Sequence, residues 1–415
     1  MLSALQVKAF RRLAALYPLD GLLEWSSSIA LMVLVYDRTG SALATGALLV
    51  CKQIVPGLLT PLAGRRLDAA PIGATIAMAM LVRALAVAGA AAVGYGAPLF
   101  VLALVAGLGG TLSRAAFRTG VARTLHGEQR RSGNALLNVA MGLVSLGGPA
   151  AAGLALTAVS ARYLLDVSAV IGLACAAAAL LLAPGRTAHV GSEPQGQPAN
   201  TDAKSADDPI SAPAPVTEPP LPVPVLLVLA GLVFTAFAMD EPSLLPYAEQ
   251  SLGEGVGVYG AILSCWGLGI IIGSVAFSRV LDRPMITVGA VGTAIAALGY
   301  LGLGLAPNAT VAFAVAIVGG IGNGFNWVAL VTAVQESTPA EEQGQAATRL
   351  EAIATVGPGV GYLIGGLMAD AANPRLTLIV PGVFALAVLA GGLAASVARA
   401  RRREPARALS TVVEI

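Results

Sequence analysis

Long apolar stretches recur along almost the whole of this sequence, and they constrain its fold more than any other feature. Each is about 20 residues long, the length that an α-helix needs to cross the hydrocarbon core of a bilayer. Hydrophobic residues make up 56% of the 415 residues and charged residues only 12%, whereas a soluble domain carries roughly 25% charge. Because such a chain cannot keep its surface in water, we expect an all-α membrane protein with about twelve transmembrane helices.

The apolar stretches fall into two groups of equal size. The predicted spans are residues 13–36, 43–63, 71–92, 97–119, 133–158 and 161–184, then 223–247, 256–278, 284–305, 310–334, 345–370 and 375–398. They predict an N-terminal bundle at 1–184 and a C-terminal bundle at 223–398, followed by a basic tail at 399–415. Segment 185–222 is rich in Pro, Ala, Ser and Asp and has no face to bury, so we expect a disordered linker.

Basic residues gather on one side of this predicted topology. If the N-terminus is cytoplasmic, only Arg38, Arg162 and Arg375 fall in outer loops, and the other loop and terminal cations fall inside. The positive-inside rule therefore places both termini and the linker in the cytoplasm. We expect a multi-pass protein of a bacterial inner (cytoplasmic) membrane, with no cleavable signal peptide because the first apolar stretch is too long for one.

The two halves repeat each other at matched places. The matched elements are YDRTGSALATGALL (36–49) and YAEQSLGEGVGVYGAIL (247–263), the loops Gly64-x-x-x-Asp68 and Ser278-x-x-x-Asp282-Arg283, and the pairs Gly148-Pro149 and Gly357-Pro358. Parallel repeats of this kind imply two bundles related by an axis along the membrane normal, with a solute site between them.

This layout resembles the major facilitator superfamily over the whole chain apart from the linker and the tail. The segment TGSALATG, with TPLAGRRLD (60–68) and YLLDVSAV (163–170), is similar to bacterial exporters of drugs and secondary metabolites in that superfamily. The resemblance implies that Gly64, Asp68, Asp282 and Arg283 lock helices on the cytoplasmic side. The chain departs from the family in the first loop, where Ala69, Ala70 and Pro71 follow Asp68, and in the fifth span, where the second Gly after Pro149 is missing.

Four acids lie inside the opening spans of the two repeats. Asp20 and Glu24 share a helical face of the first span, after Pro18, and Asp240 and Glu241 precede Pro242 in the seventh. The resemblance implies that these spans face each other across the central cavity. Since an apolar cavity favours the neutral form of a carboxylic acid, one or more of the four could carry a proton. Alternatively they are fixed partners in buried ion pairs, or reach an interface.

Buried cations form a second set of candidates. Lys52 in the second span and Arg83 in the third lie at a depth similar to that of Glu24. They could tune the acids or bind an anionic group of the substrate, or they could simply neutralise Asp20 and Glu24 within the bundle. Arg114 in the fourth span and Arg349 in the eleventh could form a cytoplasmic gate, or Arg114 could anchor its helix at the interface.

Two further groups complete the candidate site. Gly148-Pro149 and Gly357-Pro358 allow close packing and bending, so we expect helix pivots near the bundle interface. The tenth span holds two amides and an aromatic residue, Asn323, Asn326 and Trp327. They could contact substrate if this helix lines the cavity, or they could form hydrogen bonds between helices.

The sequence holds no catalytic set, no metal cluster and no phosphate-binding Gly-Lys-Ser/Thr motif, so we expect no enzyme activity and no cofactor. We predict a secondary active transporter, a monomer in the lipid bilayer without a nucleic-acid partner, that exports a small amphipathic molecule in exchange for protons. Import by proton symport or facilitated diffusion is an alternative, as is a polytopic sensor, lipid translocator or scaffold that does not transport a solute.

Overall fold

The computed structural model describes residues 5–59, 71–125, 127–182, 222–277, 283–336 and 343–413, and within these ranges all regular structure is helical. The elements are α1 (Lys8–Thr39), α2 (Ala42–Leu49), the π-helical turn η2 (Val50–Ile54), α4 (Ile72–Val93), α5 (Ala97–Thr124), α6 (Gly127–Ala158), α7 (Ala161–Leu182), α8 (Val223–Phe237), α9 (Leu244–Pro246), the π-helical turn η3 (Tyr247–Ser251), α10 (Val256–Phe277), α11 (Met285–Leu305), α12 (Ala309–Glu336), α13 (Gln343–Ala371) and α14 (Leu376–Val413). The predicted linker, apart from Pro222, lies outside the described residues, as do Gly64, Asp68 and Asp282.

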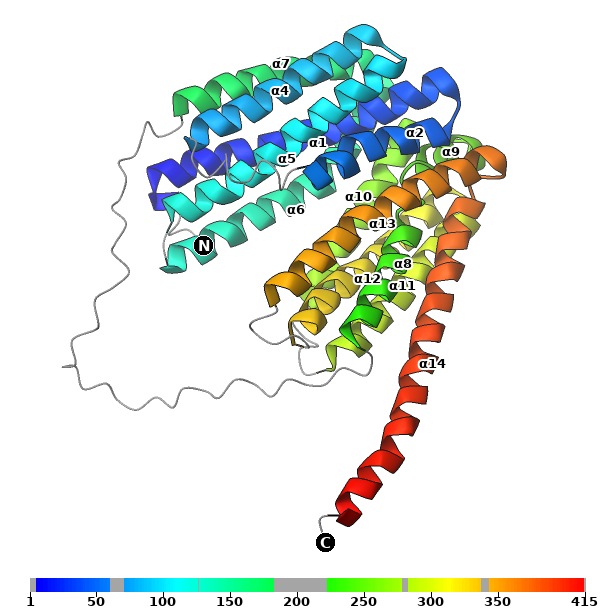
Figure 1. The fold of residues 1–415 in the computed structure, drawn as a ribbon. Coiled ribbons are helices and arrows are strands. Elements are labelled where there is room, and N and C mark those ends of the chain that lie inside the picture. Colours follow the sequence, from blue (N-terminus) through cyan, green and yellow to red (C-terminus); the bar gives the residue numbers. More distant parts are fainter. Residues whose placement is uncertain are drawn as a thin grey trace, which may run out of the picture.

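In the described part of the chain, 11 helices are long and apolar enough to cross a membrane, and they fall close to the predicted spans. The helices form two bundles, α1 to α7 and α8 to α14 (Figure 1). The bundles meet at the end that carries α2, α9 and the C-terminal end of α13, and they diverge toward the end that carries both chain termini. The fold is thus a membrane protein built from two helical bundles, as the repeat in the sequence predicts.

The seventh span is broken, and the prediction of one continuous helix at 223–247 is wrong. Helix α8 ends at Phe237, residues 238–243 form turns, and α9 and η3 continue the path. Pro242 has no N–H to donate to a helical carbonyl, so it favours a break at this place. The break leaves Asp240 and Glu241 on irregular backbone, which at membrane depth is tolerated where it is buried in protein or lines a cavity.

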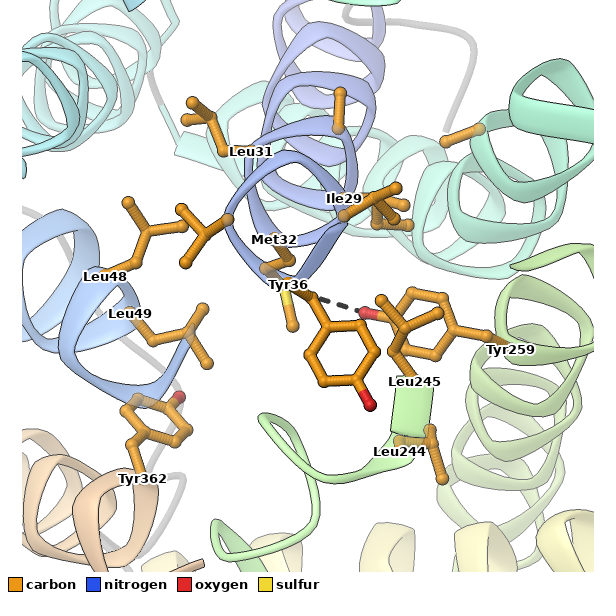
Figure 2. Packing of buried hydrophobic residues seen from close by; sticks show 14 of the residues in the cluster. Ile29, Leu31, Met32, Tyr36, Leu48, Leu49, Leu244, Leu245, Tyr259 and Tyr362 are labelled. Carbon is orange, nitrogen blue, oxygen red and sulfur yellow. Dashed lines mark hydrogen bonds between the residues drawn. The ribbon is translucent and has the colours of Figure 1, made fainter. Parts of the chain in front are cut away.

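A shared hydrophobic cluster closes the end where the bundles meet. It combines Met32 and Leu49 of the N-terminal half with Leu245, Tyr259 and Tyr362 of the C-terminal half, all of them buried. Figure 2 shows these side chains pointing toward one another from α1, α2, α9, α10 and α13, and the Tyr259 hydroxyl donates to the sulfur of Met32 at 3.6 Å. Apolar contact between the halves therefore seals this end of the molecule.

Glycines permit the close approach of backbones at this seal. The main contacts between the bundles join α2 to α13 and α6 to α10. Gly46 of α2 packs against the backbone carbonyl of Tyr362, and Gly260 of α10 packs against that of Pro149. Gly46 and Gly260 occupy matched places in the repeated segments 36–49 and 247–263, so the repeat reflects one packing solution used twice.

Candidate functional site

The acids of α1 lie in a network of ion pairs inside the N-terminal bundle. Arg83 of α4 binds the Asp20 carboxylate and also lies 3.3 Å from that of Glu24. Lys52 binds the other Glu24 oxygen and donates to Ser28 Oγ at 2.5 Å. Asp20, Lys52 and Arg83 are 2%, 2% and 3% exposed, respectively. Two carboxylates therefore face two cations at close range, and each charge is compensated.

Local backbone geometry positions the members of this network. Lys52 belongs to η2, a π-helical turn that interrupts the second span, and such turns are frequent at functional sites. Helix α1 runs without a break through Pro18 and presents Asp20 and Glu24 one turn apart. Gly110 of α5 leaves room for the network, because a Cβ there would lie 2.9 Å from a Glu24 oxygen and 3.7 Å from the Arg114 guanidinium.

The acids of the seventh span lie in a different environment. The Tyr300 hydroxyl lies 3.2 Å from Asp240 Oδ2 and 2.9 Å from the Phe237 carbonyl, so it can donate to either. Gln53 donates to Glu241 at 3.3 Å. Within the described ranges, no Lys or Arg nitrogen lies within 4.0 Å of the Asp240 or Glu241 carboxylate. This pair of adjacent acids is held by neutral partners, unlike the acids of α1.

The Glu241 contact crosses between the two bundles. Gln53 follows Lys52 in η2, and its amide oxygen lies 3.4 Å from the Tyr362 hydroxyl of α13. A polar chain therefore runs from Glu241 through Gln53 to Tyr362, from the C-terminal half to the N-terminal half and back. Because Lys52 and Gln53 are neighbours in the chain, η2 touches both acid groups, and movement of one bundle against the other must alter these contacts.

Aromatic rings surround the Asp240 side of the site. Tyr300 stacks on Phe237 with ring centroids 4.9 Å apart, and the Trp266 ring is tilted against Tyr300 with centroids 4.7 Å apart. Tyr300 is 3% exposed. A site that combines acids with aromatic faces can bind a molecule that has both an apolar body and a polar or cationic group.

Asp370, near the C-terminal end of α13, joins the bundles where they meet, and no feature of the sequence pointed to it. Its carboxylate accepts hydrogen bonds from the Ser41 hydroxyl at 2.5 Å and from the N–H groups of Ala42 and Leu43 at 2.6 and 3.1 Å. Beside it, Gln250 donates to the Tyr36 hydroxyl at 2.6 Å. An acid of α13 thus caps the N-terminus of α2, where a negative charge is favourable.

The two Gly-Pro pairs differ in what they contact, because only Gly148-Pro149 reaches the other bundle while Gly357 packs within its own bundle. A Cβ on Gly148 would lie 3.1 Å from Trp25 of α1, and the next residue, Pro149, meets Gly260 of the other bundle. A Cβ on Gly357 would lie 3.2 Å from the Gly231 carbonyl of α8. Helices α6 and α13 continue through their prolines. A pivoting role for these pairs stays a prediction.

Of the other predicted residues that the structure describes, only Arg114 lies at the acid site, near Glu24. Asn326 is buried and lines a separate apolar cavity in the C-terminal bundle. Trp327 is 43% exposed and packs against Phe234, with ring centroids 5.7 Å apart. Asn323 is half-buried, Arg114 is half-buried beside Glu24, and Arg283 and Arg349 are exposed. In the described ranges, no group of three or more His, Cys, Asp and Glu residues could hold a metal ion.

Comparison with known proteins identifies the family that shares this architecture. The sequence profile described as Major Facilitator Superfamily matches residues 14–348 and 226–413. Among curated proteins no match is found. Similar solved structures include a bacterial homologue of the human lysosomal transporter Spinster in an inward-facing, unoccupied conformation, with 13% identity, a TM-score of 0.70, and coverage of 94% of this chain and 96% of that chain.

Two other solved structures give the same fold. A POT family transporter in complex with 5-aminolevulinic acid is 12% identical with a TM-score of 0.70, covering 94% of this chain and 96% of that chain. A bacterial homologue of the iron transporter ferroportin in an inward-facing state is 14% identical with a TM-score of 0.69, covering 94% and 99%, respectively. At these identities the likeness concerns the fold, and together with the matched profile it leads to one conclusion: this multi-pass membrane protein belongs to the major facilitator superfamily of transporters.

Proposed function

We propose that this protein is a proton-coupled exporter of a small amphipathic molecule, and that the adjacent acids Asp240 and Glu241 carry the coupling proton. The environment of these two carboxylates supports the proposal. They lie on the broken part of the seventh span, half-buried, with Tyr300 and Gln53 as hydrogen-bond partners and no described cation within 4.0 Å. An acid without a compensating cation is stabilised by protonation when it is taken out of water.

The acids of α1 are assigned a structural role in this proposal. Asp20 and Glu24 are compensated by Arg83 and Lys52, and a carboxylate in such a pair keeps its charge. Glu24 nevertheless has a 22% exposed side chain, so it can sense a bound substrate. Of the alternatives that the sequence left open, the geometry therefore favours proton transfer in the seventh span and ion pairing in the first.

The proposed cycle uses the contacts between the bundles. Substrate enters from the end where the bundles diverge, which we assign to the cytoplasm because the basic residues and both termini belong to that side. It displaces a proton from Asp240 or Glu241 and packs against the aromatic rings around Tyr300. The bundles then rock about the Gly148-Pro149 and Gly357-Pro358 elements, the seal opens outward, and an external proton reloads the acid after the substrate leaves.

Location and assembly are part of the same proposal. We place the protein in a bacterial inner membrane as a monomer, with small-molecule substrate and protons as its partners. In the state that is open to the outside, the loops after the second and eighth spans, with Gly64, Asp68, Asp282 and Arg283, lock the cytoplasmic ends of the helices.

The test uses inverted membrane vesicles that contain the protein. A proton gradient is imposed, candidate amphipathic compounds are added, and proton movement is followed with a pH-sensitive dye. The proposal predicts substrate-triggered proton efflux that is lost in Asp240→Asn/Glu241→Gln and kept in Glu24→Gln, even if the latter binds substrate more weakly. Glu254→Gln, which changes an exposed acid of the loop before α10, is the matched control and should behave as the wild type.

The outcomes separate the alternatives. Efflux that survives in the double variant, but is lost in Glu24→Gln, would indicate that an acid of α1 carries the coupling proton. Substrate that accumulates on the same side as the incoming protons would indicate symport. Substrate binding without any proton movement would overturn proton coupling.

A further inference from the structure

The C-terminal bundle contains an apolar cavity that the proposed transport cycle does not use. It has a volume of about 340 Å³ and lies among α8, α11, α12 and α14, between Leu226 and Phe234 along α8. Asp240 and Glu241 are not part of its lining. The cavity thus lies beside the part of α8 that precedes the break, toward the end of the bundle where the chain termini lie (Figure 1).

The side chains that line the cavity favour a hydrocarbon ligand. Leucine, alanine and valine side chains dominate it. Two of its polar side chains are satisfied within their own helices, because Thr293 donates to the Gly289 carbonyl at 2.9 Å and Ser396 donates to the Leu393 carbonyl at 2.7 Å. A cavity of this size lies at the lower end of the range of small-ligand sites, about 300–1,000 Å³. The third polar side chain of the lining, Asn326, is a single amide among apolar side chains. The occupant should therefore offer mainly CH₂ and CH₃ groups.

The cavity communicates with the lipid phase. Its lining includes Val291 of α11 and Leu393 of α14, which are 54% and 64% exposed. In a membrane protein, side chains of this type on the outer face of a bundle contact acyl chains. A molecule can therefore enter the cavity sideways from the bilayer, without passing the acid site.

Two arginines lie close in sequence to residues that line the cavity. Arg283 precedes the lining residue Met285 by two positions, at the start of α11. Arg399 follows the lining residue Ser396 by three positions, so the two share a face of α14. Among the residues that the structure describes, neither guanidinium has an acid within 4.0 Å. Guanidinium groups bind phosphate through paired hydrogen bonds, and cations at a membrane surface attract anionic lipids.

From this arrangement we infer an anionic-phospholipid site: one acyl chain occupies the cavity among α8, α11, α12 and α14, and the phosphate lies between Arg283 and Arg399. The bilayer itself supplies the ligand. A bound lipid would fill the space between α8 and α12 and so stabilise the C-terminal bundle near the start of the broken span. The cavity does not include the acid site, and Arg283 is the one residue that the inferred lipid site shares with the proposed cytoplasmic lock.

The test measures thermal unfolding of the full-length protein in a neutral detergent with added dioleoylphosphatidylglycerol or, at the same mole fraction, dioleoylphosphatidylcholine. We expect phosphatidylglycerol to raise the Tm of the wild type by several degrees more than phosphatidylcholine does. Arg283→Ala/Arg399→Ala should lose this difference. Lys8→Ala/Arg11→Ala, which removes two exposed cations from the other bundle, is the matched control and should keep it.

A second variant tests the position of the acyl chain. Ala290→Phe places a ring in the cavity and should also abolish the preference, while native mass spectrometry should show fewer retained phosphatidylglycerol molecules than in the wild type. Equal stabilisation by both lipids in the wild type would overturn the inference. So would a preference that survives in Arg283→Ala/Arg399→Ala or in Ala290→Phe, or one that is lost equally in Lys8→Ala/Arg11→Ala.

Discussion

The carboxylate of Asp370 accepts a hydrogen bond of 2.5 Å from the hydroxyl of Ser41, across the interface between the two bundles. The same carboxylate also accepts from two backbone N–H groups of the first turn of α2. Since α2 and α13 belong to different halves of the transporter, this contact exists only while the bundles are closed at this end. We therefore expect Asp370 to act as a latch whose strength contributes to the balance between the two conformations of the proposed cycle.

Removing this latch should shift the conformational balance. Hydrogen bonds to an exposed carboxylate stabilise a state by about 1–2 kcal/mol, so Asp370→Ala should raise the population that is open at this end by ~5- to 30-fold. The measurement is the spin-label distance between Arg38→Cys and Glu254→Cys in a variant without Cys51, Cys175 and Cys265. Asp370→Ala should increase the fraction of long distances. Asp166→Ala, which removes an exposed acid of α7, should not, and an unchanged distribution in Asp370→Ala would argue against the latch.

The ion pair of Asp20 and Arg83 should govern the stability of the N-terminal bundle. Arg83→Met leaves a buried carboxylate without its partner, and breaking such a pair typically destabilises a protein by about 3–5 kcal/mol. Asp20→Asn/Arg83→Met removes both charges and should recover much of the loss. Thermal unfolding in detergent, followed by tryptophan fluorescence, checks this order. A double variant less stable than Arg83→Met would contradict the pairing, and Arg11→Met controls for loss of an exposed cation.

Much of this fold can be predicted from the sequence because a bilayer restricts the structures that a spanning chain can adopt. The length of each apolar stretch indicates a transmembrane span, and the repeated segments 36–49 and 247–263 indicate the two bundles. The candidate acids Asp20, Glu24, Asp240 and Glu241 could also be predicted, since charge at membrane depth is costly and therefore rare. The break at residues 238–243 could have been expected from Pro242, but a prediction based only on the length of the apolar stretch missed it.

Pairing between distant helices could not be predicted in the same way. Similar depth in the membrane suggested Lys52 and Arg83 as partners of Asp20 and Glu24, but the sequence could not show which acids these cations reach, because they lie on other helices. Tyr300 and Tyr362 carried a weak signal, since a tyrosine within a span usually finds a hydrogen-bond partner. Gln53 and Asp370 act across the bundle interface, and their partners follow only from the packing of the two halves.

The seal between α6 and α10 should depend on the absence of a side chain at Gly153. A Cβ there would lie 2.9 Å from the Val256 carbonyl oxygen and 3.0 Å from the Gly260 Cα, and backbone atoms cannot move aside as a flexible side chain can. Gly153→Ala should therefore push the two helices apart at a cost of about 1–3 kcal/mol. The spin-label pair described for Asp370 should report more of the long distance in this variant.

Helix α6 supplies a matched control for this substitution. A Cβ on Gly147 would meet no atom within 4 Å. Gly147→Ala should therefore leave the distances unchanged and could even stabilise the helix, because alanine favours it by ~0.5–1 kcal/mol. Equal effects of Gly147→Ala and Gly153→Ala would show that helix propensity, and not contact between the bundles, is responsible.

Arg375 should stabilise the C-terminal bundle at the sealed end. Its guanidinium donates to the carbonyls of Gly304, Ala306 and Ser251 at 3.1, 2.7 and 2.9 Å. It thereby satisfies the C-terminal end of α11, where a cation is favoured. Arg375→Gln should lower the free energy of unfolding by about 1.5–3 kcal/mol and so lower the Tm in detergent. Arg38→Gln changes an exposed arginine in the last turn of α1 and should have little effect, and equal losses in both variants would contradict a specific cap.

The most direct test of the central claim compares two modes of transport in the same proteoliposomes, once a substrate is known. One is uptake driven by a proton gradient, and the other is substrate counterflow, which requires alternating access but no net proton transfer. If Asp240 and Glu241 carry the proton, Asp240→Asn/Glu241→Gln should abolish gradient-driven accumulation and keep counterflow, whereas Glu24→Gln should keep both. Gradient-driven accumulation at the wild-type level in Asp240→Asn/Glu241→Gln would contradict the account.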